Sequence, residues 1–206
     1  MTRPIEVNNR VIREAVVAQG WNRPDDDVLH LVGIRGATPV FHEQKWVVLP
    51  TAPRTNRYDD AIGVFGPEFH LFRGTTDPGK TFTVSPLNPL GAAHLEPGRY
   101  RYGIGKHRGY PALVQNDMVT VRRDRDRDGL AEPGEPLDKG WYGINIHAGG
   151  SHPAVNRYSA GCQVLAGTWS DASWEHFWNI VADYGANQTG FWYHLLTWDM
   201  VRAVQS

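Results

Sequence analysis

Apolar residues recur every three or four positions in two segments of the chain, and this spacing predicts an amphipathic helix in each. The first helix covers residues 8–19, where Asn8 or Asn9 is suited to cap its start and Gly20 to end it. The second covers Ser170–Tyr184 and ends at Gly185. The apolar stripes are Val11, Ile12, Ala15 and Val16 in the first helix and Trp174, Phe177, Trp178 and Val181 in the second.

Short apolar runs bounded by turn residues predict strands over much of the remaining chain. The predicted strands are Leu29–Ile34, Tyr100–Ile104, Ala112–Gln115, Met118–Arg122, Trp141–His147 and Phe191–Leu196. Residues 46–79 mix apolar runs with proline and glycine turns. No repeat or linker divides the chain, so we expect one domain over residues 1–206, with residues 1–25 as an N-terminal helical extension. The predicted fold class is mainly β with α elements, two helices being packed on the strands.

The composition is that of an ordinary globular protein, with 41% hydrophobic and 21% charged residues. A net charge of −1 argues against a nucleic-acid partner, because such binding depends on neutralising phosphates. No run approaches the ~20 apolar residues of a membrane helix. The N-terminal residues include several charges and lack the apolar core of a secretory signal. A substrate outside the cytoplasm would therefore require export by processing or delivery by a phage. The oligomeric state is not set by any of these features.

Candidate chemistry begins in the predicted strand Trp141–His147. Its residues alternate in polarity, so that Asn145 and His147 share the polar face, and a flexible Ala-Gly-Gly segment follows. Cys162, the only cysteine of the chain, lies fifteen residues after His147 and ends the segment Ser159-Ala-Gly-Cys162. A thiol has a pKa near ~8.5 and needs a neighbouring imidazole to become a nucleophile at neutral pH. We therefore expect His147 to activate Cys162, and to lower its pKa enough for rapid alkylation towards pH ~6.5.

The residues around the thiol fit this chemistry. Gly161 permits a tight turn that can aim backbone N–H groups at the oxyanion of an acyl-transfer intermediate. The hydroxyl of Ser159 can orient the turn, and Asn145 can hold either the imidazole or the substrate. His107 and Tyr110, in a turn after a predicted strand, either touch the substrate or belong to a surface loop. The alternative for Cys162 is a small buried side chain without a catalytic role.

His147, Gly149 and Ser159-Ala-Gly161-Cys162 resemble the catalytic motif of the L,D-transpeptidase family, a histidine followed by Ser/Thr-X-Gly-Cys. Further stretches are similar to a bacterial and phage branch of that family. They are Leu31–Arg35, Thr75–Gly79, Gly103–His107, Tyr110–Gln115 and Gly143–His147.

The resemblance implies a β-sandwich or barrel catalytic fold, an acyl-enzyme on Cys162, and a peptidoglycan stem peptide with a meso-diaminopimelate–D-alanine bond as substrate. It also implies that the protein acts in the cell envelope, and it gives Gly149 a place in the substrate site. One departure is the residue after the cysteine. Many members have arginine or asparagine there to hold substrate, whereas this chain has Gln163.

Asp124, Asp126, Asp128, Gly129 and Glu135 match the calcium-loop pattern D-x-D-x-D-G-x5-E, in which the Leu130 carbonyl would also be a ligand. Strands are predicted on both sides in place of helices, and four nearby arginines oppose the negative charge. We therefore expect a solvated, self-paired turn rather than a Ca²⁺ site, and no cofactor. His194 is expected to pack inside its strand.

Three functions remain open from the sequence. The first is a transpeptidase, or an L,D-carboxypeptidase or endopeptidase, that acts on peptidoglycan stems through Cys162. The second is a phage lytic or virion-associated hydrolase with the same site. The third, of a different class, is a wall-binding or virion structural domain without catalysis. Thiol reactivity and the products formed from muropeptides separate the three.

Overall fold

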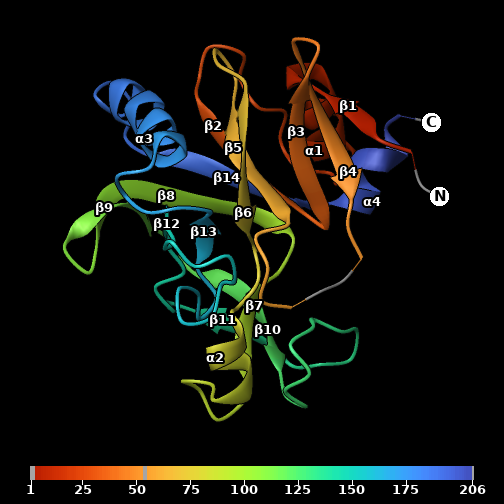
Figure 1. Ribbon diagram of the computed structural model, residues 1–206. Helices are drawn as coiled ribbons and strands as arrows, with labels where there is room; N and C mark the ends of the chain where they lie inside the picture. The colour runs from red at the N-terminus through yellow and green to blue at the C-terminus, as the bar shows by residue number, and fades with distance from the viewer. Residues whose placement is uncertain (1–2, 53–54, 206) are drawn as a thin grey trace.

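Eight strands close into a barrel in the computed structural model, which describes residues 3–52 and 55–205 (Figure 1). In order around the barrel they are β12 (Ile146–Ala148), β13 (Gln163–Leu165), β6 (His70–Thr75), β5 (Asp60–Phe65), β2 (His30–Arg35), β14 (Phe191–Thr197), β8 (Gly98–His107) and β9 (Tyr110–Gln115). Neighbouring strands are antiparallel, except that β12 runs parallel to β13 and β2 runs parallel to β14. The protein is therefore mainly β with a few helices, as the sequence predicts.

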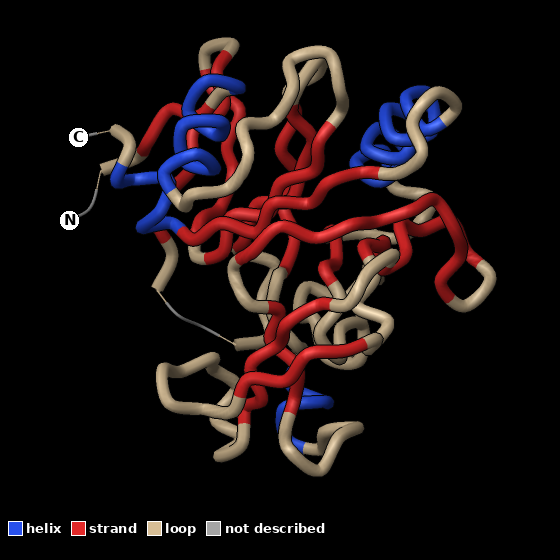
Figure 2. Tube along the Cα trace, turned by 180° about the vertical axis from the view of Figure 1, so that it is seen from behind, coloured by secondary structure: helices blue, strands red, loops and turns tan. Residues whose placement is uncertain are grey.

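Two three-stranded sheets flank the barrel. One has the order β1 (Ile5–Val7), β4 (Lys45–Pro50) and β3 (Ala37–His42), and the other β11 (Leu137–Gly140), β10 (Val119–Asp124) and β7 (Ala92–Leu95). The helices are α1 (Asn9–Ala18), α2 (Lys80–Val84), α3 (Ala172–Gly185) and α4 (Trp198–Ala203). Figures 1 and 2 show α1 and α4 beside the first sheet, α3 on the opposite side of the barrel, and α2 next to the second sheet.

The predicted apolar stripes lie in two hydrophobic cores. Trp174, Phe177 and Val181 of α3 are buried in the core that also contains the barrel residues Tyr102 and Tyr193. The stripe of α1 lies in a second core together with residues of β1, β3 and α4. The Asn8 side chain accepts a hydrogen bond from the Val11 N–H and so caps α1. Both helix predictions are confirmed, to within two residues at each end.

The predicted strand Trp141–His147 is wrong over most of its length. Only Ile146–Ala148 forms a strand, and the backbone before it is held by a side chain instead of a neighbouring strand. The Tyr142 and Ile144 N–H groups both donate to Oε1 of Gln115. Because Gln115 satisfies these groups, the alternating pattern does not correspond to a ladder there. His147 is also buried, with 2% of its surface exposed, and does not lie on a solvated polar face.

Other elements were not resolved by the pattern of residues. Residues 46–79 contain most of β4 and all of β5 and β6, which the sequence indicated only as apolar runs. The N-terminal segment is not purely helical, because β1 precedes α1 and pairs with β4. Strands of three residues, such as β1, β12 and β13, are too short to show an alternation and are defined by their partners. Across the described residues, no helix has the length and apolar character needed to cross a membrane.

Candidate active site around Cys162

Parallel pairing of β12 and β13 brings the cysteine back to the strand that carries the histidine. Ile146 pairs with Gln163 and His147 pairs with Val164. Gln163 donates its N–H to the Asn145 carbonyl at 2.9 Å, so Cys162 lies beside Asn145. A parallel connection requires a crossover of a dozen or more residues, and the segment between His147 and Cys162 supplies it. A tight turn between adjacent strands would not bring Cys162 and His147 together in this way.

The turn before Cys162 is held by Ser159 and depends on Gly161. The Ser159 hydroxyl donates to the Cys162 carbonyl at 2.8 Å and accepts from the Gly161 N–H at 3.1 Å. Gly161 has φ +133°, and a Cβ there would lie 2.6 Å from the Ala93 carbonyl oxygen. The sequence prediction that these two residues shape the turn is thus supported by geometry. However, the Gly161 N–H is bound to Ser159, so it is not free to stabilise an oxyanion in this conformation.

The thiol itself is enclosed, with 8% of the Cys162 surface exposed. Its sulfur accepts from the Asn145 N–H and donates to the Gly143 carbonyl, both at 3.4 Å. Burial raises the pKa of the Cys162 thiol to about 11, although the N–H groups of Asn145 and Cys162 and the charge of Arg108 act in the opposite direction. The prediction of a lowered thiol pKa is therefore wrong for this closed state. The reason is desolvation, which the sequence does not show.

The imidazole of His147 is held in one tautomer. Its Nδ1 lies 2.7 Å from the Ala148 carbonyl, which can only accept, so Nδ1 carries the proton. Nε2 is buried and has no hydrogen-bonding partner among the described residues. Burial, together with smaller contributions from His107 and Arg108, lowers the pKa of His147 to about 4, although the hydrogen bond to Ala148 acts in the opposite direction. His147 is thus a neutral base whose lone pair is unoccupied.

The sulfur of Cys162 and one ring nitrogen each of His107 and His147 lie within 4.8 Å of one another. Three such ligands also suit a metal ion, but the two imidazoles are stacked with an interplanar angle of 9°. The lone pairs of a ring nitrogen lie in the ring plane, so two parallel rings cannot both point at one ion. The arrangement therefore favours a thiol–imidazole pair over a metal centre.

A column of stacked rings covers His147. His107 stacks on it with ring centroids 4.2 Å apart, and Trp169 lies parallel to it at 5.9 Å. Tyr110 stacks on Trp169 at 4.5 Å, and the Trp169 indole donates to the Pro111 carbonyl at 3.0 Å. His107 and Tyr110, predicted to contact substrate, are thus brought to the site. Trp169 was missed, because a lone tryptophan before a helix carries no pattern.

Two other predicted residues, Asn145 and Gly149, have structural contacts, and so does Gln163, the residue that departs from the family pattern. Asn145 does not hold His147; its Nδ2 lies 3.1 Å from Nδ1 of His107, and its Oδ1 accepts from the Gln115 N–H. Gly149 donates to the Leu165 carbonyl and is packed against the Tyr58 hydroxyl, which leaves no room for a side chain. The side chain of Gln163 is fully buried. It bonds to the Gly161 carbonyl and accepts from the Tyr193 hydroxyl, so it supports the turn.

Arg108 is a further residue that the sequence did not single out, although it lies between His107 and Tyr110. It is exposed in the turn joining β8 to β9, with φ +51°. Its charge affects the pKa values of Cys162, His147 and His107 in this structure, which places it near all three. It is the cation best placed to attract an anionic group of a substrate.

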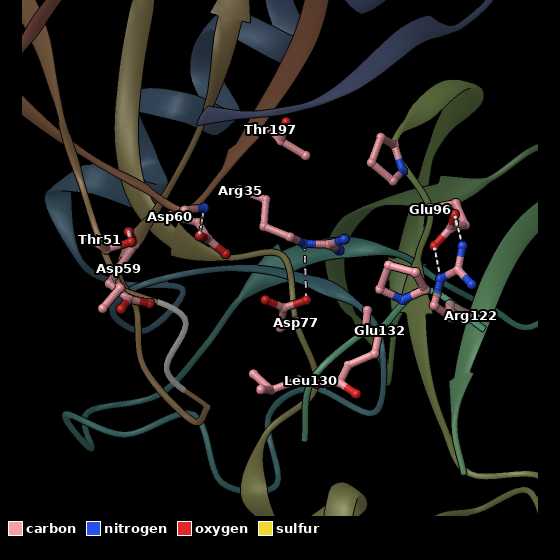
Figure 3. Close-up of a pocket in the computed structure, with 15 residues that line it drawn as sticks. Arg35, Thr51, Asp59, Asp60, Asp77, Glu96, Arg122, Leu130, Glu132 and Thr197 are labelled. Carbon is pink, nitrogen blue, oxygen red and sulfur yellow. Dashed lines mark hydrogen bonds and ion pairs between the residues drawn. The ribbon is translucent and has the colours of Figure 1, made fainter. Parts of the chain in front are cut away.

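A cavity of about 460 Å³ lies on another side of the barrel and has charged walls (Figure 3). Arg35 contacts Asp77 at 3.1 Å, and His94 contacts the same carboxylate at 2.9 Å. Burial opposes the ionisation of Asp77, but Arg35 and His94 hold its pKa below the ordinary value. Neither Cys162 nor His147 lines this cavity.

The acidic loop is well separated in sequence from this site and joins β10 to β11. The structure brings together the carboxylates of Asp124, Asp126 and Asp128, with ligand atoms within 4.8 Å of one another. Glu135 is outside that group, and its carboxylate accepts from the Arg125 and Glu132 N–H groups.

The chain matches no protein-family model, no curated protein and no solved structure. Its function must therefore be argued from the site itself.

Proposed function

We propose that the protein is a cysteine acyltransferase or peptidase of peptidoglycan stem peptides, with Cys162 as nucleophile and His147 as base. One observation carries the proposal. Nδ1 of His147 donates to the Ala148 carbonyl, so Nε2 is unprotonated, and Nε2 has no partner among the described residues. A ring nitrogen of the same imidazole lies within 4.8 Å of the Cys162 sulfur. General-base activation of a thiol requires an unprotonated imidazole beside it, and the thiol, which donates to the Gly143 carbonyl in this structure, would turn towards the imidazole to react. The resemblance of the motif to L,D-transpeptidases supports the substrate class and an envelope location.

In the proposed reaction, the thiol proton passes to Nε2 of His147 as the sulfur attacks the carbonyl carbon of the scissile amide. The imidazolium then protonates the departing amine, and the C–N bond breaks to leave a thioester on Cys162. An amine of a second stem, or water, attacks the thioester and gives its proton to His147, and the sulfur departs to recover the thiol. The Asn145 and Cys162 N–H groups, which face the sulfur, are the nearest donors for the oxyanion.

The state of the pair before reaction follows from the two pKa values. With the thiol near 11 and the imidazole near 4, both groups are neutral at pH 7. Proton transfer must therefore accompany attack, instead of preceding it as in a preformed ion pair. Because the thiol is 8% exposed, substrate entry also requires movement of the residues that cover it.

The barrel is consistent with the catalytic fold implied by the resemblance, and we include an L,D-transpeptidase-like fold in the proposal. In this interpretation, the parallel pair β12–β13 holds the two catalytic residues, and the ring column of His107, Trp169 and Tyr110 forms one wall of the substrate site. Arg108 would bind a carboxylate of the stem peptide.

Incubation of the purified chain with muropeptides, followed by mass spectrometry, tests the proposal. Loss of D-alanine, a new crosslink or a cleaved crosslink would each identify one reaction. Cys162→Ala should reduce turnover by about 10³-fold or more, whereas its melting temperature should change little. His42→Ala is the matched control and should retain activity, because His42 is exposed at the end of β3, far from Cys162 in the sequence. If muropeptides are unchanged by the wild type, or if Cys162→Ala keeps its activity, the proposal fails.

The enclosure of the thiol favours one other function, a wall-binding or virion structural domain. Cys162 packs with Tyr58, Val155 and Val164 in a small apolar cluster, as a structural cysteine does. Such a domain would sediment with purified cell walls and leave muropeptides unchanged. Cys162→Ala would then bind walls as the wild type does.

A further inference from the structure

The loop Asp124–Glu135 contains a buried carboxylate, Asp124, of which only one oxygen has a hydrogen-bonding partner among the described residues. Asp124 is completely buried, and one of its oxygens, Oδ2, accepts from the Gly129 N–H at 3.0 Å. The other oxygen, Oδ1, is buried and has no hydrogen-bonding partner among the described residues. A buried carboxylate oxygen without a partner costs free energy unless a cation or a proton occupies it.

The exposed carboxylates of the loop converge on that buried group. One oxygen each of Asp124, Asp126 and Asp128 lies within 4.8 Å of the others. An ion between three oxygens that are no more than 4.8 Å apart would lie within about 2.8 Å of each, close to the usual Ca²⁺–oxygen distance of about 2.3 to 2.6 Å. The loop thus combines a buried carboxylate oxygen that lacks a partner among the described residues with three carboxylates close enough to share one ion.

The nearby arginines do not neutralise this group as a self-paired turn would require. Arg122 forms an ion pair with Glu96, and Arg123 forms one with Asp138, both at 2.9 Å. These two arginines therefore point their charge at carboxylates outside the loop. Arg125 and Arg127 are exposed, so their charges are screened by solvent.

We propose that the loop Asp124–Glu135 binds one Ca²⁺ ion. Asp124, Asp126 and Asp128 would be the side-chain ligands and Leu130 a carbonyl ligand, with Gly129 at the position where the loop turns sharply, at φ +89°. All donors are oxygens, which excludes a preference for soft metals. Ca²⁺ accepts six to eight oxygen ligands in varied geometry, whereas Mg²⁺ requires near-ideal octahedral geometry and retains several waters, so a loop that offers carboxylates and a carbonyl suits Ca²⁺ better.

Glu135 occupies the last position of the calcium-loop pattern, but without an ion its carboxylate binds backbone N–H groups of the loop. Its two oxygens accept from the Arg125 and Glu132 N–H groups at 2.8 and 3.0 Å, so it already spans the loop. A carboxylate can accept more hydrogen bonds than these two, and a small shift would bring it to the ion. Glu135→Gln should therefore weaken binding less than loss of the aspartates.

The site has a structural consequence beyond the loop. Leu130, Ala131, Glu132 and Pro133 line the cavity of Figure 3, opposite Arg35 and Asp77. Figure 1 shows the segment after β10 extending from the edge of the second sheet. An ion that fixes this segment would fix that wall of the cavity.

Calorimetry and thermal unfolding of the full chain test the proposal. After removal of metal with EDTA and dialysis, CaCl2 should give a one-to-one binding isotherm and raise Tm by about 5 to 10 °C at saturation. The double variant Asp126→Asn/Asp128→Asn, whose altered side chains are exposed, should lose both effects. Asp183→Asn, an exposed aspartate in α3, is the matched control and should keep them.

Three results would overturn the proposal: no binding by the wild type, equal binding by the double variant, or MgCl2 binding as tightly as CaCl2. The double variant must first show a circular dichroism spectrum like that of the metal-free wild type. If it does not, Glu135→Gln provides the comparison, and an unchanged Ca²⁺ affinity in that variant together with no wild-type Tm shift would also refute the site.

Discussion

Two pairs of stacked or contacting histidines, in which every ring but the half-buried His107 is buried, have similarly lowered pKa values and different surroundings. His107 and His147 stack in parallel at 4.2 Å, whereas His30 and His194 meet edge to face at 5.5 Å. Burial lowers the pKa of His147 and His30 to about 4 and that of His194 to about 3. Both pairs include ring nitrogens without a partner among the described residues. A low pKa and an unpaired nitrogen are therefore not enough to mark a catalytic histidine.

What separates the pairs is the chemistry next to them. His30 and His194 are surrounded by the rings of Phe65 and Trp21, so they behave as aromatic core residues. His147 has a thiol within 4.8 Å, and its tautomer is set by the Ala148 carbonyl. The candidate site is therefore defined by the sulfur and by the fixed tautomer.

Replacing the two histidines should separate their roles most strongly. His147→Ala should reduce muropeptide turnover by about 10² to 10⁴-fold, because the general base is lost. His194→Phe should retain turnover, since a phenyl ring fills a similar space among apolar neighbours. Steady-state kinetics of both variants, with circular dichroism to verify folding, measure this. Equal losses in the two variants would remove the distinction between the pairs.

The rate at which Cys162 is alkylated should show whether Cys162 and His147 are both neutral in the folded chain. With the thiol pKa near 11, iodoacetamide should react about 100-fold more slowly with the folded chain at pH 7 than with the chain unfolded in urea. The rate should increase with pH up to about 11. Rates measured by intact mass spectrometry from pH 6 to 10 test this. Fast alkylation of the folded chain at pH 6.5 would show instead that a thiolate–imidazolium pair exists in the free protein.

The core pair should govern stability at acidic pH. His30, His194 and His147 have lowered pKa values, so below pH ~6.5 the unfolded chain binds protons that the folded chain excludes. The contribution of these histidines to the free energy of unfolding is fully present above pH ~6.5. It decreases as pH falls towards 4, by about 3 kcal/mol for each histidine at most. Asp60, with its pKa raised to about 7 by burial, acts in the opposite direction throughout this range, because the folded chain binds its proton before the unfolded chain does.

His194→Phe tests that linkage, because it removes one of the three titrating groups. Urea unfolding at pH 7.5 and pH 5 should show a smaller loss of stability in this variant than in the wild type. His42→Phe, at an exposed hairpin position, should leave the pH dependence unchanged. A variant with the full pH dependence of the wild type would contradict the role given to His194.

The smallest expected effect concerns Arg108. If its guanidinium binds a carboxylate of the stem peptide, Arg108→Ala should raise KM by about 3 to 10-fold and leave kcat almost unchanged. Lys106→Ala, an exposed cation in the same hairpin, is the control and should have little effect. An unchanged KM in Arg108→Ala would place substrate recognition elsewhere, for example on the column of His107, Trp169 and Tyr110.

The sequence by itself determined the class of fold, both long helices and the identity of the candidate nucleophile and base. Periodicity shows an element when it repeats over many residues, as in α1, α3 and the barrel strands β2 and β14. Cys162 could be chosen because it is the only cysteine and follows Ser159 and Gly161. These properties depend on neighbouring residues in the chain, so the sequence alone is enough to predict them.

Tertiary structure alone decided how the site is built. The three-residue strands β12 and β13 exist because they pair with each other, and Arg108 and Trp169 reach His147 from distant parts of the chain. Burial reversed the expected pKa of Cys162, since desolvation depends on every neighbour and not on the motif. Tertiary structure also buries Asp124 and leaves its Oδ1 without a partner among the described residues, which the sequence pattern does not predict. Long-range packing sets the solvent exposure and the hydrogen-bonding partners of each side chain. The pKa values and reactivity of the motif residues depend on these two properties.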